Sequence, residues 1–292
     1  TMIITRLKGG MGNQMFQYAF GKSMATALQT DFQLDLTSLL DRSKKDFVHR
    51  NYDLDIFELT PNFNFNPSVL KWLYRLKSSS ITRMVKKYVE GGQQYIKEGH
   101  FHVVQSLIEQ PQDRAFYDGW WQSETYFRTV APEIRKAFRF KTPVLEAARP
   151  LLEKIEQHNS ICLNVRRTDF LKVDTLNTTN LAYFERGAQY LAERITEPHF
   201  FIFSDDIEWC QKNIQLPHPI QVVGHEIKGR KFGNYLQLMK ACKHYIIPNS
   251  SFAWWAIWLN ERPEKIVVAP KNWFNDPDIN TTDLVPSNWV RL

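Results

Sequence analysis

The C-terminal half of the chain alternates short apolar runs with longer stretches of helical pattern. The apolar runs are residues 161–165, 200–203, 220–223, 245–247 and 266–269, and the helix-like stretches between them are residues 181–195, 207–213, 235–243 and 252–261. Short apolar strands that alternate with helices predict a parallel sheet covered by helices on both faces. In such sheets ligands bind at the carboxyl ends of the strands.

The N-terminal half opens with the same pattern. Residues 2–7 predict a strand, and residues 15–28 predict a helix because apolar side chains recur every fourth position from Phe16 to Leu28. A glycine-rich turn, residues 9–14, joins the two elements. We therefore expect a strand–turn–helix unit here as well.

The glycine-rich turn contains Gly12, Asn13 and Gln14. Glycine allows the backbone to approach a ligand closely, so this turn is a candidate ligand-contacting segment. It matches neither the dinucleotide-binding pattern nor the phosphate-binding loop of nucleotide hydrolases, because Asn13 stands where another glycine would help and no lysine follows.

Length and composition fit two modest domains. The 292 residues, of which 43% are hydrophobic, can bury two cores of about 150 residues each. Thr142-Pro143 interrupts the chain, and residues 144–158 then have the pattern of a helix that leads into the strand 161–165. We expect an α/β fold with an N-terminal lobe, residues 1–143, and a C-terminal lobe, residues 144–292.

Polar side chains follow each predicted strand of the C-terminal lobe, and these strand exits meet at one edge of the sheet. In chain order they are Arg166, Arg167 and Asp169; Ser204, Asp205 and Asp206; Gly224 and His225; Asn249, Ser250 and Ser251; and Pro270 and Lys271. This gathering predicts a nucleotide site at the carboxyl edge.

The two arginines at the exit of the strand 161–165 are the strongest part of this pattern. A lone buried guanidinium costs several kcal/mol, so Arg166 and Arg167 must face a cleft, a carboxylate or a bound anion. Arginine forks match phosphate oxygens with two parallel hydrogen bonds, which makes a pyrophosphate the natural ligand. The alternative is a structural surface pair with Asp169.

Two further segments have both a ligand-binding and a structural interpretation. Asn249 and Ser250 precede a predicted helix, whose N-terminal N–H groups and dipole favour an anion but also need an ordinary cap. Asp205 or Asp206 could accept hydrogen bonds from guanine or a ribose hydroxyl, or could cap the helix 207–213.

The net charge of +6 suits an anionic ligand or surface, and the excess is concentrated. Residues 60–89 contain no acidic residue but six lysines and arginines, from Lys71 to Lys87, with Trp72 and Tyr74 among them. One interpretation is a solvated helical hairpin whose aromatic side chains pack in the core. The other is an amphipathic surface that contacts acidic lipid at the inner membrane face. Nucleic-acid binding is disfavoured because no recognition module accompanies the segment.

The cellular compartment follows from what the sequence contains. No apolar run approaches the roughly 20 residues that a membrane span needs, and no signal-peptide pattern precedes the first strand. The three cysteines, Cys162, Cys210 and Cys242, are far apart and fall in predicted strands and helices. We expect reduced core thiols in a cytoplasmic protein rather than a metal cluster.

Five ordered segments of the chain resemble the motifs of the bacterial α-1,2-fucosyltransferases. They are residues 9–19 (GGMGNQMFQYA), 119–127 (GWWQSETYF), 165–170 (VRRTDF), 203–206 (FSDD) and 249–255 (NSSFAWW). The resemblance implies two Rossmann-like lobes of the glycosyltransferase B type with a cleft between them. It also implies GDP-fucose as the donor, inversion at the anomeric carbon, and the 2-hydroxyl of a terminal galactoside in a glycan as the acceptor.

The same resemblance implies roles for individual residues. Arg166 would bind the β-phosphate of GDP. Ser250, Ser251 and the Phe252 N–H would hold phosphate oxygens, and Asp205 or Asp206 would hold guanine or ribose. Gly12, Asn13 and Gln14 would face the cleft from the other lobe. Further candidates for contact with the donor are Arg167, Ser204 and Asn249. Asn164 departs from the family, whose members usually carry histidine two residues before the first arginine. It is still a candidate for contact with the donor, because an amide that touches guanine can form a hydrogen bond with it.

The chemistry of the transfer leaves two questions open. Arg166 together with a helix N-terminus could replace a divalent metal, so we expect no cofactor, although residues 276–278 spell the D-x-D of metal-dependent glycosyltransferases. Candidates for the general base are Asp169, Asp174 and Glu124. A fucosyltransferase of other linkage or acceptor, or a non-catalytic GDP-sugar-binding protein, is the alternative function.

Overall fold

The computed structural model describes residues 2–42, 49–76 and 78–292. The chain forms two compact units, Thr1–Lys141 with Asn280–Leu284 and Thr142–Ile279 with Val285–Leu292. The sequence had placed the division after residue 143 and all later residues in the second lobe. The segment Asn280–Leu284 joins the first unit because Ser123 Oγ donates to the Asp283 carbonyl at 2.7 Å and Val103 N donates to Asp283 Oδ2 at 2.9 Å.

The first unit is built on a four-stranded parallel sheet in the order β2-β1-β4-β3. Its strands are β1 (Met2–Arg6), β2 (Asp31–Asp35), β3 (Gln94–Lys97) and β4 (Ala115–Asp118). The helices are α1 (Met11–Leu28), α2 (Thr37–Leu40), α3 (Pro67–Arg75), α4 (Ser79–Glu90), α5 (Gln105–Glu109) and α6 (Ala131–Ala137), with 3-10 turns η1 (Leu54–Ile56), η2 (Glu124–Tyr126) and η3 (Arg128–Val130).

Helix α1 begins four residues before the predicted start, directly after Gly10, its N-cap. Gly9 has a positive φ of 76°, which turns the chain sharply between β1 and α1, so the helix already begins inside the glycine-rich motif. Phe20 is fully buried and stacks on Trp121 with ring centroids 4.1 Å apart. The helix therefore lies inside the core of the first unit.

The second unit contains a six-stranded parallel sheet in the order β10-β9-β8-β5-β6-β7. The strands are β5 (Asn159–Val165), β6 (Pro198–Ser204), β7 (Ile220–Val222), β8 (His244–Ile246), β9 (Val267–Ala269) and β10 (Val290–Arg291). The helices are α7 (Arg149–Gln157), α8 (Leu181–Ala192), α9 (Ile207–Asn213), α10 (Gly233–Ala241) and α11 (Ser251–Leu259), with 3-10 turns η4 (Glu146–Ala148), η5 (Phe170–Lys172), η6 (His225–Ile227) and η7 (Arg230–Phe232). All five predicted strands are present, whereas the predicted helix 144–158 begins only at Arg149, after η4.

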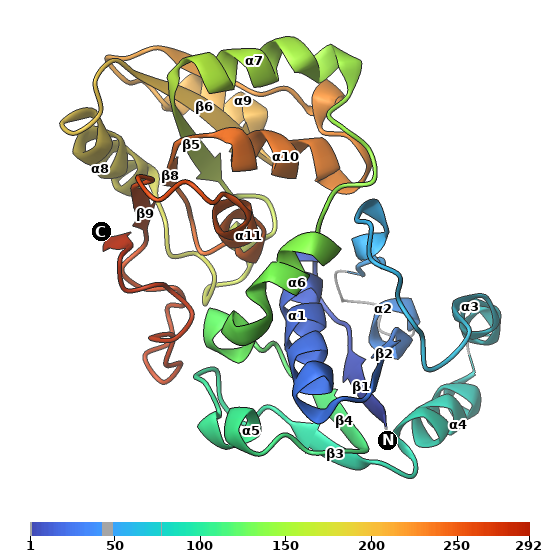
Figure 1. The fold of residues 1–292 in the computed structure, drawn as a ribbon. Helices are drawn as coiled ribbons and strands as arrows, with labels where there is room; N and C mark the ends of the chain where they lie inside the picture. The colour runs from blue at the N-terminus through green and yellow to red at the C-terminus, as the bar shows by residue number, and fades with distance from the viewer. Residues whose placement is uncertain (1, 43–48, 77) are drawn as a thin grey trace. The chain divides into compact units, whose positions relative to one another are not determined.

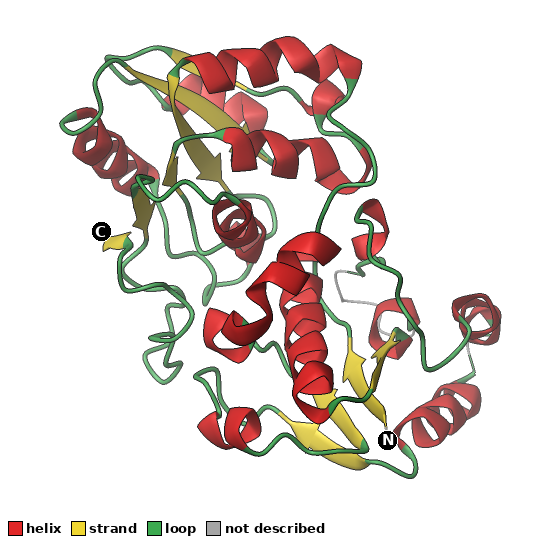
Figure 2. Cartoon of the chain, in the orientation of Figure 1, coloured by secondary structure: helices red, strands yellow, loops and turns green. Residues whose placement is uncertain are grey.

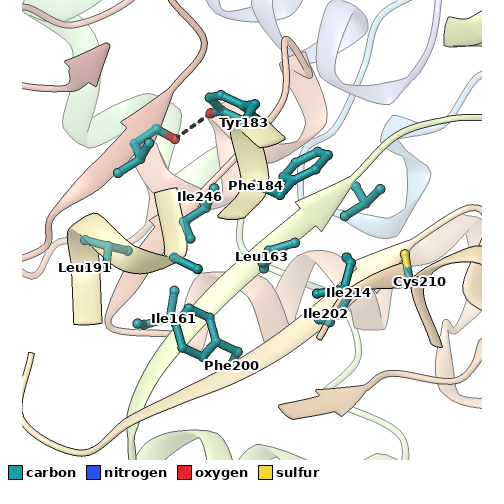
Figure 3. Packing of buried hydrophobic residues seen from close by; sticks show 13 residues of the cluster. Ile161, Leu163, Tyr183, Phe184, Leu191, Phe200, Ile202, Cys210, Ile214 and Ile246 are labelled. Carbon is teal, nitrogen blue, oxygen red and sulfur yellow. Dashed lines mark hydrogen bonds between the residues drawn. The ribbon is translucent and has the colours of Figure 1, made fainter. Parts of the chain in front are cut away.

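Helices pack on both faces of this sheet, as predicted. Ile161 and Leu163 of β5 belong to the cluster that α8 and α9 cover (Figure 3). Within this cluster the Tyr183 hydroxyl of α8 donates to the Val268 carbonyl at 3.3 Å, the dashed line in the figure. On the opposite face Phe203 of β6 packs against Tyr235 of α10 with ring centroids 5.4 Å apart. The sheet is therefore a rigid support for the loops at its edge.

The strand order reverses between β5 and β8. From β5 the chain adds β6 and β7 on one side, and then β8, β9 and β10 on the other (Figure 1). At such a switch point neighbouring loops diverge to opposite faces and leave a crevice at the carboxyl edge. The exits of β5 and β8 carry the arginines and Asn249-Ser250.

Two sequence expectations concern the whole chain. Cys162, Cys210 and Cys242 are free and buried, as predicted, and burial raises the pKa of Cys210 to about 11. No helix within the described residues is both long enough and apolar enough to cross a membrane.

Candidate donor site at the switch point of the second sheet

Asp205 holds the loop that carries the two arginines. Strands β5 and β6 run in parallel register with Val165 beside Ser204, so the residues after each strand meet at the sheet edge. Asp205 Oδ1 accepts from Arg167 N at 2.9 Å, and Oδ2 accepts from Thr168 N at 3.3 Å and Thr168 Oγ1 at 2.5 Å. One carboxylate therefore fixes the backbone of the loop from the next strand.

Arg166 lies between two carboxylates with part of its side chain open to solvent. Its Nη2 donates to Asp169 Oδ1 at 2.5 Å, its Nη1 lies 3.4 Å from Asp205 Oδ2, and the side chain is 28% exposed. Its guanidinium carbon lies 5.1 Å from the centre of the Phe170 ring. The predicted arginine–Asp169 pair thus forms with Arg166, and the guanidinium is oriented before any anion arrives.

Arg167 is pinned to the start of α9. Its Nε donates to Asp206 Oδ2 at 3.2 Å, and its guanidinium carbon lies 3.8 Å from the centre of the Trp209 ring. Asp206 Oδ1 accepts from Trp209 N at 3.1 Å and caps the helix. The sequence left open whether Asp205 or Asp206 binds a ligand or caps the helix, and Asp206 is the one that caps it.

Two buried asparagines at the switch point each have a side-chain oxygen that accepts no hydrogen bond from the described part of the protein. Asn164 Nδ2 donates to the Phe203 carbonyl at 3.0 Å, and Asn249 Nδ2 donates to the Trp273 carbonyl at 2.8 Å. Within the part of the chain that the structure describes, Oδ1 of Asn164 and of Asn249 is buried and lacks a hydrogen bond. A buried acceptor left unsatisfied costs about 1–3 kcal/mol, so each amide is suited to accept from a ligand.

The N-terminus of α11 follows β8 after a short loop. Ser250 is its N-cap, with Oγ accepting from Ala253 N at 3.3 Å. By helix geometry the N–H groups of Ser251 and Phe252, the first two helical residues, have no intrahelical acceptor. Anions are stabilised at this end of a helix by those N–H groups and by the dipole.

Ser204 and Asp174 complete the predicted residues of the second unit. Ser204 is buried, and its Oγ accepts from Asp206 N at 2.9 Å, which shapes the turn into α9. Its carbonyl accepts from His225 Nε2 at 2.8 Å. Asp174 is exposed in the loop after η5. The structure thus gathers the predicted residues around the exits of β5, β6 and β8, with Asp174 on the loop beyond.

Two of the predicted residues of the first unit, Asn13 and Gln14, form hydrogen bonds with other parts of that unit. Gln14 is fully buried and brackets the turn, because Nε2 donates to the Gly9 carbonyl at 3.0 Å and Oε1 accepts from Asp53 N at 2.9 Å. Asn13 Oδ1 accepts from Gln122 Nε2 at 2.6 Å, which ties the first motif to the second. Gly12 is buried in α1, and Glu124 is half-buried in η2.

A buried ion cluster in the first unit was missed from the sequence. Arg6 contacts Asp35 at 3.1 Å, Asp118 at 2.9 Å and Glu90 at 2.6 Å, and Lys8 contacts Asp118 at 2.7 Å. Burial opposes ionisation of Asp118, but hydrogen bonds from Lys8 and Tyr95 and the nearby positive charges outweigh it and lower its pKa to about 2. The available signal was that Arg6, Asp35 and Asp118 each end a parallel strand.

The D-x-D sequence forms a turn. Asp276 Oδ1 accepts from Asp278 N at 3.0 Å. Among the described residues no group of three or more histidine, cysteine, aspartate or glutamate side chains is arranged to hold a metal ion.

Comparison with known proteins places this geometry in a family. The sequence model described as Glycosyl transferase family 11 matches residues 1–292. An α-1,2-colitosyltransferase of Escherichia coli is 30% identical, with 100% of this chain and 99% of that protein covered. The galactoside 2-α-L-fucosyltransferase Sec1 of Mus musculus is 23% identical, with 88% of this chain and 64% of that protein covered.

Solved structures support the fold. The fucosyltransferase NodZ from Bradyrhizobium matches with a TM-score of 0.51 at 15% identity, covering 88% of this chain and 91% of that one. This likeness and the two parallel sheets confirm the predicted fold class, α/β with two Rossmann-like lobes of the glycosyltransferase B type. The resemblance carried by the five motifs is confirmed by the family match over the whole chain, and the protein belongs to glycosyl transferase family 11.

Proposed function

We propose that the protein transfers L-fucose from GDP-fucose to the 2-hydroxyl of a terminal galactoside with inversion and without a metal ion. The observation that carries the proposal is that the loop with Arg166 and the start of α11 follow the neighbouring, paired strands β5 and β8. This pairing supports a diphosphate at the switch point, the place where open α/β sheets bind ligands.

Arg166 is the group best suited to the departing diphosphate. A guanidinium has five N–H donors, and the contacts of Arg166 with Asp169 and Asp205 involve one terminal nitrogen each, so donors remain for a phosphate. Cleavage of the fucosyl–phosphate bond develops negative charge on the β-phosphate. Preoriented donors aimed at such charge contribute about 3–4 kcal/mol each.

The N–H groups of Ser251 and Phe252 would add a second set of donors to the diphosphate. Arg167, pinned on Trp209, would hold the same anion or the ribose side of the donor with its remaining N–H groups. Asn164 and Asn249 would use their buried Oδ1 atoms to accept from N–H or hydroxyl groups of the donor. In this arrangement Asn164 takes the place of the histidine that related enzymes carry.

The base for the acceptor hydroxyl is proposed among Asp169, Asp174 and Glu124. Asp169 also orients Arg166, so Asp169→Asn should lower both donor affinity and kcat. A residue that acts only as the base should lose kcat when changed to the amide and keep its KM for the donor. Asp174→Asn and Glu124→Gln provide that comparison.

A second donor is favoured by one observation. The relative that is 30% identical over the full length of this chain is named a colitosyltransferase. GDP-colitose is therefore the competing donor. Colitose is fucose without the 3-hydroxyl, so a site that forms hydrogen bonds with that hydroxyl would accept GDP-fucose and strongly disfavour GDP-colitose.

The test is to incubate the protein with GDP-fucose or GDP-colitose and lactose, and to determine the linkage and anomeric configuration of the product. An α-1,2-fucosyl product supports the proposal. A colitosyl product alone, or a different linkage, overturns the donor or the acceptor. Binding of GDP without either transfer or donor hydrolysis would instead support a non-catalytic GDP-sugar-binding protein.

A further inference from the structure

Exposed apolar side chains gather on helices α3 and α4 of the first unit. Trp72 is 59% exposed, Met84 60% and Tyr88 73%, and Val69 and Leu76 are also exposed. The two helices contact each other and lie at the margin of the unit, teal in Figure 1 and red in Figure 2. We call the surface formed by these five side chains the α3–α4 face.

This face is not the one that holds the helices to the protein. The inward side of α3 is anchored by Leu70, and that of α4 by Val85 and Val89, all buried. Glu90 at the end of α4 adds an ion pair to Arg6 at 2.6 Å. An ordinary surface helix has one apolar stripe facing the core, so the outward stripe needs a separate explanation.

The outward side chains of each helix lie on one side of it. Val69, Trp72 and Leu76 follow each other at three and four residues, and Met84 and Tyr88 are four apart, so each set shares one side of its helix. The interpretation in which the aromatic side chains of this segment pack in the core is wrong for Trp72. Tyr74, in contrast, is half-buried.

The charge around the face has a single sign. Lys71, Arg75, Arg83, Lys86 and Lys87 are exposed, and residues 60–89 contain no acidic residue. Lys77, the sixth basic residue of the segment, lies outside the described residues. An anionic partner is therefore complementary to the whole segment.

We propose that the α3–α4 face docks on an anionic lipid bilayer surface. Trp72 and Tyr88 suit the headgroup level, where one part of an aromatic ring is apolar and another is polar, and Met84 and Leu76 suit the acyl boundary. The basic side chains would contact acidic headgroups, each contributing roughly a fivefold increase in binding. Exposed aliphatic and aromatic side chains beside basic ones are typical of a helix that lies at a membrane interface, and no nucleic-acid recognition module accompanies the segment, so a membrane fits better than RNA or DNA.

The test is co-sedimentation with vesicles of phosphatidylcholine, with and without phosphatidylglycerol. We expect binding only to vesicles with phosphatidylglycerol, weakening as salt is raised because surface charges are screened. Lys86→Gln/Lys87→Gln should lower that binding about thirtyfold. The matched control, Lys136→Gln/Lys212→Gln, removes the same charge from exposed helix ends elsewhere and should bind as the parent does.

A second pair of variants tests the apolar side chains of the α3–α4 face. Trp72→Gln/Met84→Gln keeps the helix propensity and should also lose binding to anionic vesicles, whereas Leu145→Gln, an exposed apolar site in the second unit, should not. Transfer to a water-soluble acceptor without vesicles should be unchanged in all four variants, which separates this proposal from the proposed function.

The proposal would be overturned by equal binding to both kinds of vesicle or by no binding to either. It would also be overturned if the control variants lost as much vesicle binding as the variants of the α3–α4 face. A change of oligomeric state in Trp72→Gln/Met84→Gln without a change in vesicle binding would overturn it as well, because the α3–α4 face would then be covered by a second copy of the chain. Circular dichroism melts should show that each variant is folded.

Discussion

Asp205→Ala removes the carboxylate that fixes the arginine loop. The backbone N–H groups of Arg167 and Thr168 and the Thr168 hydroxyl all lose their acceptor, and Arg166 loses one of its two carboxylate contacts. Because the loop bears the proposed phosphate-binding guanidinium, we expect the nucleotide affinity to fall together with the order of the loop.

The size of the effect follows from the exposure of these donors. A hydrogen bond to a charged acceptor contributes about 1.5–3 kcal/mol. Thr168 is exposed, so water can replace its two bonds, whereas Arg167 N is partly buried. The loss should therefore be close to one charge-assisted bond, about 2 kcal/mol, which corresponds to about a thirtyfold loss of affinity.

The assay is isothermal titration calorimetry with GDP, ADP and UDP. In the parent protein we expect GDP to bind far better than the other two, because a site that satisfies the donors of guanine rejects bases that lack them. In Asp205→Ala all three nucleotides should lose affinity by the same factor, because the carboxylate acts through the loop. The preference for GDP should persist.

Asp206→Ala is the matched control from the next position. It removes a helix cap, at about 1 kcal/mol of stability, and a partly exposed ion pair with Arg167, so the affinity for GDP should fall less than about fivefold. A loss in Asp205→Ala confined to GDP would refute the reasoning, because it would mean that Asp205 contacts guanine directly. Unchanged affinities would mean that the loop does not depend on this carboxylate.

Further predictions concern the phosphate, the metal, the departure from the family and the first unit. Arg166→Ala should abolish transfer and weaken GDP binding, since a phosphate loses a charged partner worth about 1.5–3 kcal/mol. Arg166→Lys should restore little activity, because a lysine ammonium cannot replace the paired N–H donors of the guanidinium. A kcat near that of the parent in the alanine variant would contradict this. Transfer rates should survive EDTA, and a loss that Mn²⁺ or Mg²⁺ restores would revive the D-x-D at residues 276–278. Asn164→Ala should weaken GDP binding in calorimetry, whereas an unchanged Kd would show that the amide has not kept the role of the histidine. The lowered pKa of Asp118, about 2, means that its ionised form stabilises the fold above the ordinary value near 4, and that this stabilisation is lost as the pH falls toward 2. Asp118→Asn should therefore lower the melting temperature at pH 7 but hardly at pH 2, and an equal difference at both pH values would rule this out.

The strands of the second unit could be predicted because they are continuous apolar runs. Five of the six strands appear at the predicted places, and β10 was missed because Val290–Arg291 is too short to form a run of its own. The helix before β5 was predicted too long. It begins at Arg149 because Pro150 suits the first turn of a helix but not its interior.

The sheet edge at which the candidate site residues lie could be predicted from the sequence, but their contacts with one another could not. The strand exits gave the positions of Arg166, Asp205 and Ser250, because carboxyl ends of parallel strands share one edge. Which aspartate holds the arginine loop and which one caps α9 depends on the register of β5 against β6, and a sequence does not contain that register. The same limit hid the Arg6 cluster, in which Asp35 and Asp118 come from separate strands.

Both units place an arginine at a strand end, and the contacts of each arginine explain why we propose the diphosphate site in the second unit. Arg6 engages Nε, Nη1 and Nη2 with three different carboxylates, and its side chain is only 10% exposed. A guanidinium satisfied in this way has little left to offer an anion, and opening the cluster would leave charges buried. Arg166 uses one contact on each of two nitrogens and is 28% exposed, and Arg167 offers only Nε to a carboxylate. The N-terminus of α11, which follows the neighbouring strand β8, adds the backbone N–H groups of Ser251 and Phe252 as further hydrogen-bond donors. Arg6 is therefore engaged by contacts within the first unit, whereas Arg166 and Arg167 are held by carboxylates and keep N–H groups from which the proposed diphosphate could accept hydrogen bonds.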